Sequence, residues 1–321
     1  MLSRVADSLY WMSRYLERAE HTARVMEVQF NLMLELSPEP EAERWLRVLR
    51  SLGVKTAGLD GEAARVLAHS LTSDPSSRTS IVACVMAARE NARQVREQIS
   101  SEMWEQLNRL FIETRRAGIE DLWEEGPVDF LNAIKEGSYL FQGITDSTMR
   151  HGEGWQFIQA GRYLERACAL SNLVDVHFAE FIADHYENSV DASDHLEWVG
   201  LLKSCTAFEA YCKVYTADAR PDRIAEFLIL NSSFPHSIRF SVDALEGALG
   251  AIGTQSPGRR ASRVERIAGR LRAMLSFSQV DEIVNSGLHS YLHNVLQQCA
   301  DVHSSLHQVY VTYPIEAALE A

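Results

Sequence analysis

Apolar side chains recur at helical spacing along most of this 321-residue chain, and the alternation that marks a β-strand is absent. The eight prolines fall between these periodic stretches or at their first residue. The pattern predicts an all-α fold, a helical bundle. The expected helices are residues 2–36, 41–55, 78–116, 128–146, 153–186, 193–216, 222–231, 235–253, 260–276 and 279–310.

One hexapeptide, RYLERA, occurs twice, at residues 14–19 and 162–167. Two further matches keep the same order and register: WLRVLRS, starting at Trp45, resembles WVGLLKS, starting at Trp198, and the turn before Ser80 resembles the turn before Ser237. Ordered matches of this kind favour an internal duplication over chance similarity between helices. We expect two pseudo-symmetric halves, residues 1–150 and 151–321, packed into one unit.

Charge and cysteine content bear on the possible partners of the chain and on its cellular compartment. Asp and Glu outnumber Lys and Arg by 44 to 31, and this net charge of -13 argues against nucleic acid and anionic membranes as partners. The five cysteines are scattered among apolar residues and predict reduced thiols. With no signal peptide or membrane span expected, the chain is assigned to the cytoplasm.

The first RYLERA copy lies on a helix with two faces. One face is an apolar stripe expected to pack in the core, and the other carries Tyr10, Arg14, Glu17, His21 and Arg24 at helical spacing. A polar stripe of this kind is usually solvated. The second copy has apolar residues nearly all round, which predicts burial of its arginines and glutamate, and by symmetry of the first copy's as well.

Two interpretations of the buried motifs remain open. In the first, they form a reciprocal lock between helices, with Glu17 bound to Arg162 or Arg166 and Glu165 bound to Arg14 or Arg18. In the second, the same groups hold an anionic substrate or move a proton.

A third polar cluster occurs in the expected helix 78–116. Arg89, Asn91, Arg93, Arg96 and Trp104 lie on it, and the first, third and fourth of these share one face. A solvated face is the common explanation, but we expect this helix to contribute Arg89, Asn91 and Arg93 to the polar centre.

Two other features carry weaker signals. His289, His293, His303 and His307 share one side if their helix is continuous, but surface histidines are the favoured interpretation over a metal site. Cys168 is the least implausible nucleophile, although a buried thiol is the default. No phosphate-binding loop is present, so no directly bound cofactor is expected, and if ATP is involved a partner must bind it.

Four stretches resemble the bacterial alpha-E family, helical proteins with a Glu-Arg motif, and the resemblance covers essentially the whole chain. They are MLSRVADSLYWMSRYLERAE at 1–20, RENARQVREQISSEMWEQLN at 89–108, GRYLERA at 161–167 and LLKSCTAFEAY at 201–211. The motif residues implied by the resemblance are Arg14, Glu17 and Arg18, then Arg89, Glu90, Asn91 and Arg93, then Arg162, Glu165 and Arg166. Ser13 and Cys168 depart from the family pattern, where Gly and an acidic residue are usual, so equal roles for the two copies are not implied.

The resemblance implies a component of an amide or peptide ligase system. Its expected partners are a circularly permuted ATP-grasp protein and a transglutaminase-like protein. On this hypothesis an acidic peptide or small carboxylate binds to Arg and Glu residues at the centre of the bundle, and the alternative is a non-catalytic scaffold locked by salt bridges. The candidate catalytic residues are Glu17 and Glu165; the candidate substrate-binding residues are Arg14, Arg18, His21, Arg89, Asn91, Arg93, Arg162 and Arg166.

Overall fold

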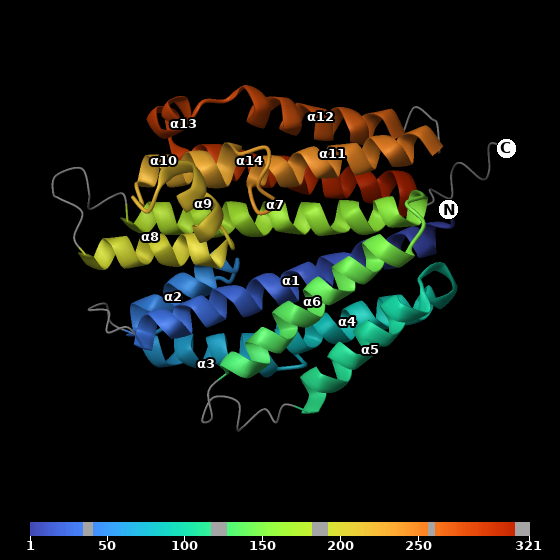
Figure 1. Ribbon diagram of the computed structural model, residues 1–321, viewed down its shortest axis with the longest axis horizontal. Coiled ribbons are helices and arrows are strands. Elements are labelled where there is room, and N and C mark those ends of the chain that lie inside the picture. The colour runs from blue at the N-terminus through green and yellow to red at the C-terminus, as the bar shows by residue number, and fades with distance from the viewer. Residues whose placement is uncertain (35–40, 117–126, 182–191, 256–260, 312–321) are drawn as a thin grey trace.

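A computed structural model describes residues 1–34, 41–116, 127–181, 192–255 and 261–311. The described residues form helices joined by turns and contain no β-strand, which confirms the all-α prediction (Figure 1). Across these ranges, no helix combines the length and the apolar character needed to cross a membrane.

The first half contributes six α-helices and a short 3-10 turn. Their bounds are α1 Ser3–Leu34, α2 Glu41–Ser51, α3 Gly61–Ser73, α4 Ile81–Gln94, η1 Arg96–Gln98, α5 Ser101–Arg116 and α6 Val128–Thr148.

The second half begins with another long helix. The bounds are α7 Glu153–Phe181, α8 Ala192–Ser204, α9 Phe208–Tyr215, α10 Pro221–Ala225, η2 Glu226–Leu230, α11 Ile238–Gln255, α12 Ala261–Phe277, α13 Val280–Ser286, α14 Leu288–Leu306 and η3 His307–Val311.

Three expected helices are interrupted, so those predictions were wrong in their continuity. Helix 78–116 ends at Gln94, and α5 starts anew where the Ser100 hydroxyl accepts a hydrogen bond from the Met103 N–H at 3.1 Å. Helices 193–216 and 279–310 break at Thr206 and Gly287, whose φ angles are +52° and +104°. A single residue in this backbone region ends helical geometry, and apolar periodicity does not reveal it.

Helix α3 was not predicted at all. Its start has an ordinary signal, because Asp60 precedes it and its side chain accepts a hydrogen bond from the Ala63 N–H at 2.8 Å. The short segment has only Ala64, Ala68 and Leu71 buried along with polar residues, so its apolar stripe is weak.

The two motif helices, α1 and α7, form the central pair of the bundle. Helices α2 and α4 pack beside them in the first half, and α8, α11 and α14 in the second (Figure 1). Contacts cross between the halves, because α2 packs against α7 and α8 against α1. One continuous hydrophobic core therefore spans residues of both halves.

The turns before α4 and α11 have the same hydrogen bonds. The hydroxyl of Ser80 donates to the carbonyl oxygen six residues earlier and accepts from the N–H three residues later, and Ser237 does the same. This likeness supports the predicted duplication and the division near residue 150, which both remain predictions.

The closest approach of α1 and α7 occurs at Gly161. A Cβ atom there would overlap the Ser13 hydroxyl oxygen and the Tyr10 carbonyl oxygen. The Ser13 hydroxyl also donates a hydrogen bond across the interface to the Ile158 carbonyl oxygen at 2.7 Å. Gly161 therefore sets the distance between the motif helices.

We expect Gly161→Ala to lower the free energy of unfolding by about 3 kcal/mol, because the backbone of α1 cannot move aside without separating the pair. The midpoint of thermal unfolding should fall by roughly 6–12 °C. Gly143→Ala on an exposed position of α6, where a Cβ meets nothing, is the control and should stabilise slightly. An unchanged midpoint in Gly161→Ala would contradict the close approach.

Candidate functional site

The charged side chains of both RYLERA copies lie between α1 and α7, where Arg14 and Arg18 are half-buried and the other four are buried. Only 2% of the surface of Glu17 and 7% of that of Glu165 is exposed, and Arg162 and Arg166 are buried too. The common interpretation of such a stripe, a solvated helix face, is therefore wrong for α1, and the predicted burial of both copies is confirmed.

Glu17 forms a two-pronged ion pair with Arg166. The Arg166 Nε donates to one carboxylate oxygen at 2.5 Å and its Nη2 to the other at 3.0 Å. The remaining Arg166 nitrogen donates to the carbonyl oxygen of Pro235 at 3.1 Å. Arg166 is thus held on all sides by acceptors.

Glu165 binds two arginines of α1. The Nε and Nη2 of Arg14 both lie 2.6 Å from one carboxylate oxygen, and the Arg18 Nε lies 2.6 Å from the other. Burial raises the pKa of Glu165, but the charges and hydrogen bonds of the two arginines outweigh it and lower the pKa below its ordinary value. Both halves of the predicted reciprocal pairing, Glu17 with Arg166 and Glu165 with Arg14 and Arg18, are therefore present.

Helix α14 and η3 complete the surroundings of Arg14. The His303 Nδ1 lies 2.8 Å from the Tyr10 hydroxyl and 3.2 Å from Arg14 Nη1, and the guanidinium lies 4.7 Å from the centre of the Trp11 ring. Burial, with Arg14 nearby, lowers the pKa of His303 to about 4, so the ring is neutral and can accept from Arg14.

A cavity of about 330 Å³ lies on the side of the centre where Arg18 and Glu165 meet. This volume is in the range of small-molecule sites. The cavity is lined by residues of α1, α2, α3 and α7 and of the segments after α2 and before α4: Arg14, Arg18, His21, Thr22, Ser51, Leu52, Val54, Leu71, Thr79, Glu165, Cys168, Ala169 and Asn172. Within the described ranges, the two terminal nitrogens of Arg18 make no hydrogen bond, although its Nε is bound to Glu165.

His21 and Cys168 also face this cavity. The His21 ring is 9% exposed, its Nε2 has no hydrogen-bond partner among the described residues, and burial lowers its pKa to about 4. A hydrogen bond with Cys299 lowers the pKa of the Cys168 thiol. The cavity therefore combines cationic arginine, neutral histidine and a thiol.

The centre as a whole is cationic. Five arginines of the two motif helices, Arg14, Arg18, Arg24, Arg162 and Arg166, meet only three glutamates, Glu17, Glu20 and Glu165. Among the described residues of these two helices, arginines at the centre exceed glutamates by two, although the net charge of the whole chain is -13. Such a local excess attracts a small anion at short range.

The third predicted cluster does not join this centre, so that expectation was wrong. Arg89 donates to the Asn108 side chain of α5 at 2.7 Å and lies 4.4 Å from the Phe111 ring centre. Asn91 donates to the Ala87 carbonyl oxygen, and Arg93 pairs with Glu90 on the surface. Arg89 faces α5 because the chain turns back after α4, which brings α5 alongside.

The four C-terminal histidines lie in two different environments. His289 and His293 are exposed, as expected, and His289 pairs with Asp175 at 2.8 Å. His303 and His307 are instead half-buried against Tyr10 and Trp11. In the part of the chain that the structure describes, no three His, Cys, Asp or Glu residues are grouped so as to hold a metal ion.

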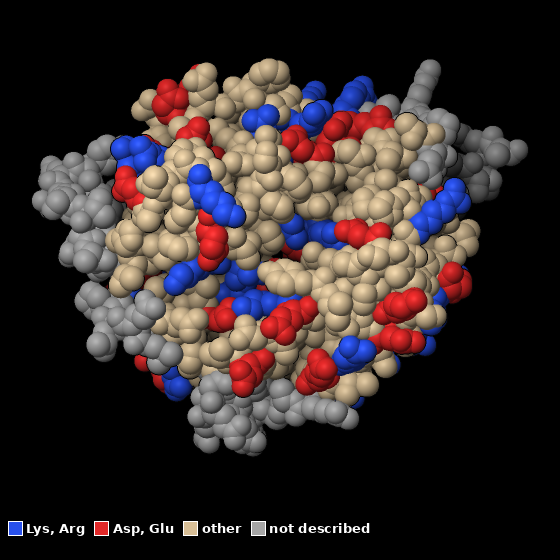
Figure 2. All heavy atoms as spheres, viewed as in Figure 1, with Lys and Arg blue, Asp and Glu red and all other residues tan. Residues whose placement is uncertain are grey.

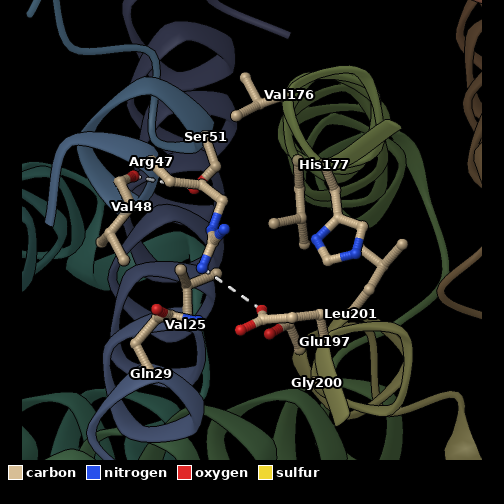
Figure 3. Close-up of a pocket in the computed structure, with 12 residues that line it drawn as sticks. Val25, Gln29, Arg47, Val48, Ser51, Val176, His177, Glu197, Gly200 and Leu201 are labelled. Atoms are coloured by element: carbon tan, nitrogen blue, oxygen red, sulfur yellow. Dashed lines mark hydrogen bonds and ion pairs between the residues drawn. The ribbon is translucent and has the colours of Figure 1, made fainter. Parts of the chain in front are cut away.

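A second buried ion-pair cluster lies beside the centre, and the sequence analysis missed it. Arg44 and Arg47 of α2 reach Glu197 of α8 at 2.7 and 3.3 Å. Figure 3 shows Arg47 extending toward Glu197, with His177 of α7 pointing into the same space. That space is about 20 Å³, room for a single water molecule. The cluster has the geometry of a closed lock; its only sequence signal is the paired tryptophan stretches at Trp45 and Trp198.

Comparison with known protein families identifies the family of this chain. A family described as "a predicted alpha-helical domain with a conserved ER motif" matches residues 1–311. The chain belongs to the Alpha-E family. The Glu-Arg sequences at the centre of this Alpha-E fold are the two RYLERA copies, whose side chains form the buried pairs described above.

Three mycobacterial proteins that carry the description "uncharacterized protein" are similar to this Alpha-E chain. A protein of Mycobacterium bovis and two from strains of Mycobacterium tuberculosis are 24–25% identical over 330 residues, which is 95% of this chain. The chain spans 36% of the length of each of these relatives. No solved structure matches it.

Glu17→Gln and Glu165→Gln should each lower the free energy of unfolding by about 3–5 kcal/mol, because each leaves buried arginine charge without its carboxylate. The melting midpoint should fall by around 10 °C. Glu90→Gln, which removes the surface partner of Arg93, is the matched control and should melt within about 1 °C of the unmutated protein. Equal melting of all three variants would show that the buried pairs contribute nothing to stability.

His21 should make stability depend on pH in the acidic range. Its folded pKa of about 4 lies below the ordinary value near 6.5, so only the unfolded chain takes up this proton as the pH falls between them, and stability is lost. Between pH 7 and 4, His21→Gln should lose about 3 kcal/mol less than the unmutated protein. Urea unfolding at a series of pH values measures this, and parallel curves for the two proteins would contradict it.

Proposed function

We propose that this chain is the carboxylate-binding component of an ATP-grasp-linked amide or peptide ligase system, and that the substrate binds in the cavity beside Arg18. The observation that carries the proposal is the state of Arg18. One of its nitrogens is bound to Glu165, and its two terminal nitrogens make no hydrogen bond among the described residues that line the cavity. A guanidinium with two adjacent free N–H groups matches the geometry of a carboxylate.

In this proposal Glu165 positions the arginines instead of acting as a base. Its carboxylate binds both Arg14 and Arg18, and its lowered pKa makes it a weaker base than an ordinary glutamate. His21, neutral and with an unpartnered Nε2, is the group available to hydrogen-bond an incoming amine or the second end of a substrate. Glu17 is saturated by Arg166 and stays outside the chemistry.

The link to ATP rests on the family resemblance of the motif sequences. A cavity of about 330 Å³ fits an amino acid or short acidic peptide, and the chain has no phosphate-binding loop of its own. ATP and the activation of the carboxylate are therefore assigned to an ATP-grasp partner. A transglutaminase-like partner, and a role of this chain in presenting the substrate, belong to the same proposal.

A second candidate function is a non-catalytic scaffold. The two-pronged Glu17–Arg166 pair and the cluster around Glu197 favour it, because in both of them arginines engage the carboxylate inside the protein. The scaffold does not account for the free nitrogens of Arg18 or for the excess of arginine over glutamate. Ligand binding separates the two candidates.

We expect sodium glutamate or a triglutamate peptide to raise the melting midpoint of the unmutated protein above that in sodium chloride of equal ionic strength. At a ligand concentration 100 times the Kd, binding stabilises by about 2.7 kcal/mol, or roughly 5–10 °C. Arg18→Gln should abolish the rise while the protein stays folded, because Arg14 still holds Glu165.

The control is Arg65→Gln, which removes an exposed arginine paired with Glu62 on α3 and should keep the full rise. A rise of the same size in Arg18→Gln would place the carboxylate elsewhere. If no carboxylate stabilises the unmutated protein at any concentration, the scaffold becomes the better account.

A further inference from the structure

Arg162 occupies the same motif position as Arg14 but has no comparable partner. Its side chain is buried, with 6% of the residue's surface exposed, yet no hydrogen bond or ion pair joins it to any described residue. Its nearest aromatic contact is the Tyr163 ring, whose centre is 6.0 Å from the guanidinium carbon. A buried arginine keeps its charge, and an unpaired buried charge is costly to hold.

The two motif copies differ in how many arginines bind the two carboxylate oxygens of each glutamate. Glu165 serves both Arg14 and Arg18, while Glu17 gives both of its oxygens to Arg166. Arg14 is further surrounded by Tyr10 and His303. Because Arg166 occupies both oxygens of Glu17, no carboxylate of the motif helices is left to pair with Arg162.

A second polar group near Arg162 also lacks a partner. Gln159 lies one turn earlier on α7, is 3% exposed, and its Nε2 makes no hydrogen bond among the described residues. Residues three apart on a helix share a face, so this amide donor and the guanidinium lie on one side of α7. Two buried donors without acceptors on one face indicate a missing acceptor.

Burial lowers the pKa of Arg162, and of the carboxylates Glu17 acts on it most strongly, but none of the described carboxylates forms an ion pair with it. Burial and the charges of Arg166 and Arg24 lower the pKa of His236, so that ring is neutral at neutral pH. Asp146, which acts on Arg162 electrostatically, is exposed and lies beyond ion-pair distance. Glu17 is already neutralised by Arg166.

Helix α6 packs against α1, and α11 packs against α7, so the two motif helices are covered by different neighbours. In Figure 2 the middle of the face shown is hollowed, with Lys or Arg side chains exposed inside the hollow, over the region where Figure 1 places α6 and α7.

We infer that Arg162, with the Gln159 amide, forms a second anion subsite that takes an oxyanion, the carboxylate or phosphate group of a small ligand. This subsite is separate from the cavity beside Arg18, because neither Arg162 nor Gln159 lines that cavity. It rests on the unpaired Arg162 and stands independently of the proposed function.

The first test is the melting midpoint of ligand-free Arg162→Gln. Removing an unpaired buried charge should leave the midpoint unchanged or raise it, whereas Arg166→Gln, which strips Glu17 of its partner, should lower it by several degrees. A fall in Arg162→Gln as large as that in Arg166→Gln would overturn the inference, because it would show that Arg162 has a stabilising partner within the protein.

The second test follows the arginine Nε–H signals in proton–nitrogen correlation spectra. The signal missing from Arg162→Gln belongs to Arg162, and the one missing from Arg18→Gln belongs to Arg18. Titration with sodium phosphate and, separately, with sodium glutamate should shift the Arg162 signal saturably with at least one of them, in the unmutated protein and in Arg18→Gln alike. Sodium chloride of equal ionic strength is the control.

The outcomes distinguish this inference from the proposed function. A shift with phosphate alone identifies a phosphate ligand, and a shift with glutamate alone identifies a carboxylate; both support the subsite. An Arg162 signal that moves no more than in chloride overturns the subsite. If the Arg18 signal then still responds to glutamate, the cavity beside Arg18 retains its role.

Discussion

The close crossing of α1 and α7 is the constraint on which the rest of this structure depends. Gly161 allows the two backbones to approach, and at that distance the glutamate of each helix reaches the arginines of the other. Buried charges of this kind are tolerated only when they are paired with good geometry. The position of each neighbouring helix decides which arginine is closed in and which still faces a cavity.

The same six-residue sequence therefore yields two unlike environments. Around Arg14, α14 and η3 supply Tyr10 and Trp11 with two histidine neighbours, and the arginine is fully engaged. Arg18 faces a cavity, and Arg162 has no ion pair among the described residues. At the second cluster, in contrast, two arginines bind Glu197 beside a space for a single water molecule. An arginine enclosed by protein groups serves here as one half of a salt bridge between helices. An arginine that faces a cavity can also bind a ligand.

Much of this could be predicted from single residues and their spacing. Apolar residues nearly all round the second motif predicted a buried Arg162 and Glu165, and reciprocity offered Arg162 or Arg166 as the partner of Glu17 and Arg14 or Arg18 as the partner of Glu165. Arg89 was misplaced because helical periodicity ran through Val95 without a signal for the turn that follows. His303 was assigned to the surface because its partner, Tyr10, lies 293 residues away in the sequence. Long-range contacts of that kind leave no local pattern.

The sequence by itself determined the helical class and indicated burial of both Glu-Arg motifs with glutamates of one helix facing arginines of the other, because helical spacing and the cost of burying charge are local properties. Only the tertiary structure decided how the pairs divide the available oxygens, with two arginines on Glu165 and one on Glu17. That division depends on side-chain reach across a helix crossing and on which helices fill the space behind. It leaves the charge excess at Arg18 and Arg162, and so the capacity to hold an anion.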